Sequence, residues 1–172
     1  MLQELKAEMI NYDCGFIKGD RKFRCRAGGF IRNKDRLLFV KTDEPGGYYY
    51  MIGGGVHICE TSRQCAEREI FEETGVKVEA SRLAVITENF FRGVGGVEDG
   101  YDCHTIEFYY LMEVSDEDAE KIGKITDQNE ELVWIPISEV EASDIKPGFI
   151  RERIHEILNT DTVLHIIEER DR

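Results

Sequence analysis

Basic residues are scarce in this chain relative to acidic ones. Its 172 residues include 22 Lys and Arg against 35 Asp and Glu, which gives a formal charge of −13 at pH 7. A surface with this charge repels nucleic-acid polymers and anionic membranes, so neither is expected as a partner. If the substrate is also an anion, positive charge must be supplied locally, and a bound metal ion is the simplest supply.

Long apolar runs and paired cysteines are lacking as well. No stretch approaches the roughly 20 consecutive apolar residues of a membrane-spanning helix. The charged N-terminus (MLQELKAEMINYD) is not expected to be a signal peptide. The five cysteines form no C-x-x-C pair, so neither a disulfide framework nor a structural zinc site is expected. These features predict a cytoplasmic protein with free thiols.

The length and the apolar fraction fit a single domain. With 172 residues and 41% apolar residues, the chain can bury a sizeable core. We expect one domain over residues 1–172, in which residues 1–22 form an N-terminal extension. The sequence leaves open whether the chain forms a homodimer.

Runs rich in β-branched and aromatic residues predict a sheet with few helices. Strands are predicted over residues 23–32, 36–41, 48–52, 83–91, 104–114 and 131–135, with a last edge strand over 163–167. Helices are predicted over 61–74, 148–159 and 2–11, and loops over 43–47, 92–102 and 115–129. This order favours an α+β domain, an α/β/α sandwich with a mixed β-sheet.

The predicted helix over 61–74 has clear signals at both ends. Thr61 and Gln64 form the pattern of a capping box, so the first helical residue should be Ser62. Gly75 stands where a glycine commonly terminates a helix.

Three glutamates gather on one side of this helix. Glu69, Glu72 and Glu73 fall within an arc of roughly 100° at 3.6 residues per turn. Like charges at these spacings repel by about 0.2–0.5 kcal/mol per pair, although Glu72 can pair with Arg68. Such a cluster fits a hard divalent cation with oxygen ligands, and a solvated acidic helix face is the alternative.

The wider pattern favours the cation. Residues 53–78 read GGGVHICETSRQCAEREIFEETGVKV and resemble the box of the Nudix hydrolase (MutT-like) family, G-x5-E-x7-R-E-U-x-E-E-x-G-U with U apolar. Every fixed position matches between residues 54 and 76: Gly54, Glu60, Arg68, Glu69, Ile70, Glu72, Glu73, Gly75 and Val76. The resemblance implies the family's α/β/α sandwich, in which the box forms a loop–helix–loop that holds divalent metal.

The resemblance also implies roles for individual residues. It assigns Mg²⁺, or Mn²⁺ in its place, to a metal-binding set that we expect to comprise Glu69, Glu72, Glu73, the Gly53 carbonyl and Glu60. Arg68 would orient the carboxylates through a salt bridge.

The reaction implied is hydrolysis of a pyrophosphate bond by a metal-activated water. The expected catalytic residues are Glu69, Glu72 and Arg68, together with Glu107 on the strand predicted over 104–114. Glu69 and Glu107 are the candidates for the general base, in that order. The expected substrate is a nucleoside-diphosphate derivative, namely a nucleoside triphosphate, ADP-ribose or a sugar nucleotide. The alternative is a nucleotide-binding sensor that has the fold but no turnover.

Other residues are candidates for substrate contacts. Arg26 and Arg92 could bind phosphate, and Tyr50 and Phe90 could stack on a base or ribose. Surface arginines and ordinary packing are the alternatives.

The chain departs from the commoner family pattern L-P-G-G-G-x-E-x-G-E just before the helix. Met51, Ile52, His57 and Cys59 replace Leu, Pro, Glu and Gly. These positions lie outside the fixed pattern, so we expect them to alter loop geometry and substrate choice more than the reaction.

Overall fold

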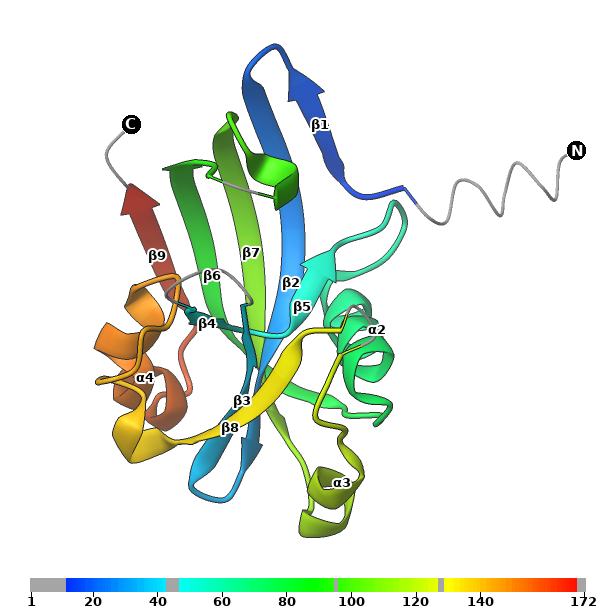
Figure 1. Cartoon of the computed structure of the whole chain (residues 1–172), viewed down its shortest axis with the longest axis vertical. Helices are drawn as coiled ribbons and strands as arrows, with labels where there is room; N and C mark the ends of the chain where they lie inside the picture. The colour runs from blue at the N-terminus through cyan, green and yellow to red at the C-terminus, as the bar shows by residue number, and fades with distance from the viewer. Residues whose placement is uncertain (1–11, 43–46, 95, 127–128, 170–172) are drawn as a thin grey trace, which may run out of the picture.

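One mixed β-sheet organises the computed structural model, which describes residues 12–42, 47–94, 96–126 and 129–169 (Figure 1). The strands are β1 (Gly15–Lys18), β2 (Arg21–Asn33), β3 (Arg36–Lys41), β4 (Tyr49–Tyr50), β5 (Gly53–Gly55), β6 (Ala80–Arg92), β7 (Asp102–Glu113), β8 (Glu131–Pro136) and β9 (Leu164–Glu169). The helices are α2 (Ser62–Thr74), α3 (Asp116–Lys121) and α4 (Phe149–Asn159), with short 3₁₀ helices η1 (Gly96–Glu98) and η2 (Ile137–Glu139).

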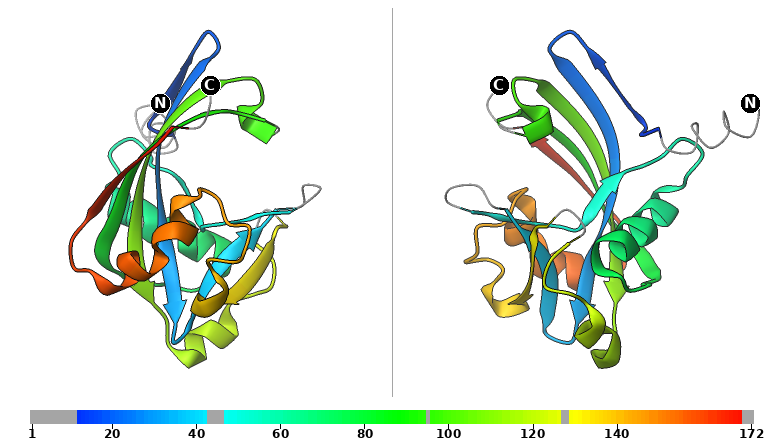
Figure 2. Two further views of the ribbon diagram at one scale, coloured as in Figure 1. Left: turned by 90° about the vertical axis from the view of Figure 1, so that its left-hand side faces the viewer. Right: turned by 45° about the vertical axis from the view of Figure 1, so that its right-hand side comes forward.

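The sheet has long central strands and short strands attached to them. Its main order is β4-β3-β2-β7-β6-β9, with β1 and β5 paired to β2 and β8 paired to β3. The β2–β7 and β6–β9 pairs are parallel, and the other strand pairs are antiparallel. Figure 2 shows α2 and α4 on different sides of this sheet.

Each of these two helices buries one apolar face. Helix α2 contributes Cys65, Ala66 and Ile70 to a core cluster with residues of β2 and β7. Helix α4 contributes Phe149, Ile150, Ile154 and Ile157 to a second cluster, which includes Phe30 and Val85 of the sheet. Burial of each such large side chain contributes roughly 1.5–3 kcal/mol. The two clusters define the predicted α/β/α sandwich.

Helix α2 begins and ends where the sequence predicts. The Thr61 side chain accepts a hydrogen bond from the Gln64 amide, and the Gln64 side chain accepts one from the Thr61 amide. Gly75 adopts a φ of 75°, which glycine tolerates without a steric penalty, and its N–H donates to the Phe71 carbonyl. Both ends of the expected metal-binding helix are therefore fixed.

Six of the seven predicted strands and two helices are confirmed with small shifts of their ends. Two predictions need correction. The strand expected over 48–52 ends at Tyr50, because residues 53–55 turn to pair with β2. Helix α3 forms inside the expected loop 115–129, where Ser115 caps it and Lys121 pairs with Glu117 and Asp118. Strand β1 was not predicted.

Two further predictions concern segments that the structure does not fully describe. The helix expected over residues 2–11 lies outside the described residues, and so does most of the turn expected over 43–47. No helix in the described ranges has the length and apolar character needed to cross a membrane.

Candidate active site

The guanidinium of Arg68 gathers the carboxylates of the box. Its Nε and Nη2 donate to the two Glu60 oxygens at 2.8 and 3.0 Å. Its Nη1 donates to Glu69 Oε1 at 2.6 Å and to Glu72 Oε2 at 3.1 Å. A further bond from Nη2 reaches the Gly55 carbonyl at 3.1 Å. The contact with Glu69 is one that helical spacing did not reveal, because the two residues are adjacent in the chain.

Arg68 and burial act on the pKa values of these carboxylates in opposite directions. For Glu60, burial acts to raise the pKa, but hydrogen bonds from Arg68 and from the His57 amide outweigh it and lower the pKa. For Glu69, burial outweighs the stabilising Arg68 contacts, and its pKa is raised. Hydrogen bonds thus dominate the pKa of Glu60, whereas burial dominates that of Glu69.

The loop before the helix brings a backbone close to Glu69. A Cβ atom added at Gly54 would collide with the Glu69 carboxylate. The glycine at residue 54 therefore allows the approach of this carboxylate to the loop that carries the Gly53 carbonyl.

A second group of polar residues lies on the sheet. Arg26 on β2 donates to the Gly53 carbonyl at 2.9 Å and to Glu107 Oε1 on β7 at 3.3 Å. The Tyr109 hydroxyl donates to the other Glu107 oxygen at 2.9 Å. Burial acts to lower the pKa of Arg26, but the charges led by Glu107 outweigh it and raise the pKa. Glu107 is therefore a buried carboxylate whose two oxygens both have partners.

The helix group and the sheet group belong to one site. The Glu69 charge contributes to the raised pKa of Arg26, and Arg26 in turn acts to lower the pKa of Glu69. The Glu73 charge similarly contributes to the raised pKa of Tyr50, behind burial and the Glu130 carboxylate. The backbone connects the two groups as well, because Arg26 bonds to the Gly53 carbonyl and Glu69 packs against Gly54.

The oxygen donors suit a hard cation in chemistry. Carboxylates and a backbone carbonyl are the ligands that Mg²⁺ prefers. Within the described ranges, no three acidic, histidine or cysteine side chains converge as a ready-made metal cluster. Instead, Arg68 donates to the box carboxylates, and Arg26 donates to the Gly53 carbonyl. The chemistry of the donor set therefore fits Mg²⁺.

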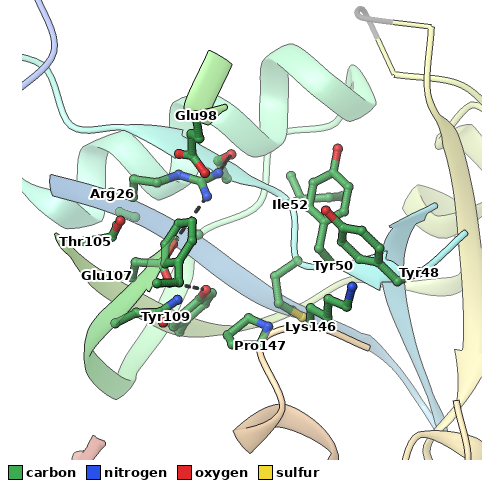
Figure 3. A pocket seen from close by; sticks show the side chains of 16 residues that line it. Arg26, Tyr48, Tyr50, Ile52, Glu98, Thr105, Glu107, Tyr109, Lys146 and Pro147 are labelled. Atoms are coloured by element: carbon green, nitrogen blue, oxygen red, sulfur yellow. Dashed lines mark hydrogen bonds and ion pairs between the residues drawn. The ribbon is translucent and has the colours of Figure 1, made fainter. Parts of the chain in front are cut away.

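A cavity adjoins this group and has two unlike walls (Figure 3). One wall carries Arg26, Glu107 and Glu98, the last from η1. The opposite wall carries Tyr48, Tyr50 and Lys146, whose ammonium lies 3.9 Å from the centre of the Tyr48 ring. The cavity thus joins a charged wall to an aromatic one.

Two predicted substrate contacts lie elsewhere. Phe90 does not line this cavity. It stacks on His104 with ring centroids 4.4 Å apart, and alternation along β6 turns Phe91 to the cavity instead. Arg92 is exposed, does not line the cavity and pairs with Asp102 at 3.2 Å. Of the predicted residues Arg26, Tyr50, Phe90 and Arg92, the cavity is lined by Arg26 and Tyr50.

Several lining residues were not predicted from the sequence. They are Lys146, Pro147, Glu98 and Asn89. Lys146 and Pro147 reach the cavity because residues 144–146 bond to Tyr49, whose amide donates to the Asp144 carbonyl and whose carbonyl accepts from the Lys146 amide, each at 2.8 Å. The β6–β7 register places Asn89 opposite Thr105 and on the face of Glu107, which alternation along a single strand could not reveal.

The unusual loop residues are accommodated without loss of the Arg68 contacts. Cys59 adopts a φ of 69° where the common family pattern has glycine. A non-glycine residue in this left-handed region is strained, at a cost of about 1–2 kcal/mol. His57 compensates in part, since its amide donates to Glu60 at 3.0 Å and its ring lies 3.5 Å from Asp13.

Comparison with known proteins identifies the family of this chain. The model of the family described as NUDIX domain matches residues 22–155. A MutT-like protein of Streptomyces ambofaciens is 34% identical over 68 residues, which cover 40% of this chain and 44% of that protein. The NAD-capped RNA hydrolase NudC of Vibrio cholerae is 32% identical over 77 residues, covering 45% of this chain and 29% of NudC. The chain thus spans less than half the length of these curated relatives.

The fold has solved counterparts too. The MutT protein from Bacillus halodurans superposes with a TM-score of 0.62 at 19% identity, over 83% of this chain and 86% of that one. Because the family match covers most of the chain, the protein belongs to the Nudix family, and the resemblance inferred from the box is confirmed.

Proposed function

We propose that this protein is a Mg²⁺-dependent hydrolase that cleaves the pyrophosphate bond of a nucleoside-diphosphate-linked substrate. The observation that carries the proposal is the set of Glu60, Glu69 and Glu72 held by Arg68. Glu69 packs against Gly54, and the neighbouring Gly53 lines a cavity together with Arg26 and three tyrosines. The substrate classes remain nucleoside triphosphates, ADP-ribose and sugar nucleotides.

Each part of the site has a role in this reaction. Glu69, Glu72, Glu73 and the Gly53 carbonyl would hold Mg²⁺, and Glu60 would support them directly or through water. Bound Mg²⁺ neutralises the diphosphate and lowers the pKa of a water. Arg68 would keep the carboxylates in place.

The proton and the leaving group have defined destinations. The water oxygen bonds to one phosphorus, the bridging P–O bond breaks, and the electron pair leaves with the second phosphate. A carboxylate accepts the proton of the water. Glu69 is favoured over Glu107 for this step, because both Glu107 oxygens already accept hydrogen bonds.

A panel assay tests the proposal. The protein with Mg²⁺ should release a nucleoside monophosphate or pyrophosphate from at least one of a panel of nucleoside triphosphates, ADP-ribose, sugar nucleotides and dinucleotides such as NAD, detected by chromatography. Excess EDTA should abolish the release, because the carboxylates then have no cation to share.

The same assay separates an enzyme from a nucleotide-binding sensor. The Glu72→Gln variant serves as the control with one carboxylate neutralised. If the wild type binds a panel compound tightly yet forms no more product than this variant, the sensor is correct.

Substitution of the two arginines first considered for phosphate binding, Arg26 and Arg92, should affect KM to different extents. Arg26→Gln should raise KM by about 10- to 100-fold, because it removes a hydrogen bond to a charged phosphate and such a bond changes affinity by about this factor. Arg92→Gln, which removes the same charge from an exposed ion pair, should leave KM within about twofold. Steady-state kinetics on the best panel substrate measures both. Equal effects of the two substitutions would remove Arg26 from the substrate site.

A further inference from the structure

Five polar side chains cover the sheet beneath the cavity, and we call them the polar floor: Arg26 of β2, Thr105 and Glu107 of β7, and Thr87 and Asn89 of β6. They lie side by side in the strand registers. Arg26 pairs with Glu107, Glu107 with Thr87, and Thr105 with Asn89. All but Thr87 line the cavity (Figure 3 draws their side chains).

The polar floor contains buried atoms without partners. Within the described part of the chain, Asn89 Oδ1, Thr87 Oγ1 and Arg26 Nε are buried and make no hydrogen bond. Asn89 is 8% exposed and Thr87 is fully buried. A buried polar atom without a partner costs about 1–3 kcal/mol. Two of these atoms, Asn89 Oδ1 and Arg26 Nε, belong to residues that line the cavity, which indicates a surface prepared for a polar ligand.

Asn89 lines the cavity and has an acceptor, Oδ1, without a partner among the described residues. The one carboxylate of the floor, Glu107, already accepts from Arg26 and from Tyr109. In this orientation of the Asn89 amide, a phosphate cannot satisfy Oδ1, because ionised phosphate oxygens only accept hydrogen bonds. The partner must be a hydroxyl or an amino group of the substrate.

The position of Asn89 selects between these groups. Thr105, its register partner, is two residues before Glu107 on β7, which is about 7 Å along the strand. If the diphosphate lies beside Arg26 and the α2 carboxylates, Asn89 is separated from it by about the length of one sugar. A ribose hydroxyl reaches this point, whereas an exocyclic amino group on the base lies farther along the nucleotide.

We propose that Asn89 is a specificity-determining residue that accepts a hydrogen bond from a ribose hydroxyl, so that the site selects ribonucleotides over deoxyribonucleotides. This inference rests on the proposed function and specifies its substrate class. It assigns to the β6 face a role distinct from the metal-binding helix and from the aromatic wall.

The test compares ligands that differ by one group. Calorimetry with Mg²⁺ present would measure the Kd of ADP, 2′-deoxy-ADP, 3′-deoxy-ADP and IDP for the wild type. We expect ADP to bind at least about tenfold more tightly than one of the two deoxy compounds, because that ligand leaves Asn89 unpaired. IDP lacks the adenine amino group and should bind like ADP.

Two variants tie this preference to Asn89. Asn89→Leu should lose the discrimination, so that ADP and the deoxy compound bind within about twofold of each other. Asn89→Asp keeps an acceptor and should retain the preference. Asn89→Leu should not lower Tm, because the oxygen it removes has no partner. A purely structural role would instead lower Tm and weaken all four ligands equally.

The outcomes separate this inference from the proposed function. If the wild type binds none of the four compounds and turns over none of the panel, both fail. If it binds ADP without ribose preference, or keeps the preference in Asn89→Leu, only the role of Asn89 is overturned. If Asn89→Leu removes a preference for ADP over IDP, Asn89 contacts the base and the ribose assignment is wrong. Should Asn89→Leu not fold, Asn89→Ala and Asn89→Asp carry the same comparison.

Discussion

Glu69→Gln and Glu73→Gln should each lower kcat by at least about 100-fold. The substitution preserves the shape of the side chain but removes a negative charge that would hold Mg²⁺, and loss of one positioned electrostatic group costs about this much. Glu69 should be the more sensitive of the two, because it is packed against Gly54 and bonded to Arg68.

Metal binding gives a second measurement for the same variants. Titration with Mn²⁺, with the free ion followed by electron paramagnetic resonance, should show weaker binding in both variants than in the wild type. Glu79→Gln is the matched control, since Glu79 is exposed just beyond the C-terminal end of α2. If both variants retain most activity and bind Mn²⁺ like the control, these glutamates are not the metal-binding set.

These glutamates could be found from the sequence because their geometry is local. The capping box, the spacing of Glu69, Glu72 and Glu73, and the glycine at residue 75 all lie within one helix and its ends. Helical periodicity then determines which side chains share a face. Hydrogen bonds between residues close in the sequence define such a helix. The helix and its faces can therefore be predicted without knowledge of the rest of the fold.

The cavity could be predicted only in part, because its walls come from distant segments. Tyr48 and Lys146 meet because the chain at 144–146 bonds to Tyr49, a contact between segments almost 100 residues apart. Nothing in the local pattern of either segment specifies that contact. The same limit affected Phe90 and Phe91, since two adjacent aromatic residues on a strand fit either face until the helices that cover the sheet are known.

Helix α3 shows a different limit. Its six residues, Asp116–Lys121, lack an apolar stripe, and only Ala119 is buried. A segment so short and polar has a weak periodic signal, although Ser115 before it is an N-cap residue. The N-cap residue Ser115 therefore indicates this helix better than its hydrophobic periodicity does.

Arg68→Met should lower the free energy of unfolding by about 2–3 kcal/mol at pH 7, as expected when one partner of a largely buried ion pair is removed. The side chains of Arg68, Glu60 and Glu69 are 22%, 14% and 14% exposed, so the two glutamates would be left charged with little solvent. For a domain of this size the loss corresponds to a fall in Tm of roughly 4–12 °C.

The loss of unfolding free energy in Arg68→Met should depend on pH in a defined direction. In the wild type the pKa of Glu60 is lowered, so its stabilising contribution is present above the unfolded pKa, near 4.3, and disappears as the pH falls through the folded value. Without Arg68, burial would raise the pKa of Glu60 and raise that of Glu69 further, and both carboxylates would take up protons more readily. The difference between wild type and variant should therefore be largest at neutral pH and narrow as the pH approaches 4.

Urea unfolding followed by circular dichroism at pH 7 and pH 4 measures this difference, and Arg153→Met provides the matched control. Within the part of the chain that the structure describes, Arg153 on α4 pairs only with Glu156, at 2.8 Å, and both side chains are more than a third exposed. Its removal should cost less than about 1 kcal/mol at pH 7, as for exposed ion pairs in general. A loss in Arg68→Met that equals the control, or one that stays constant between the two pH values, would show that Arg68 does not hold Glu60 and Glu69 in the folded protein. A large loss that narrows at pH 4 would place the structural support of the candidate metal site on this one guanidinium.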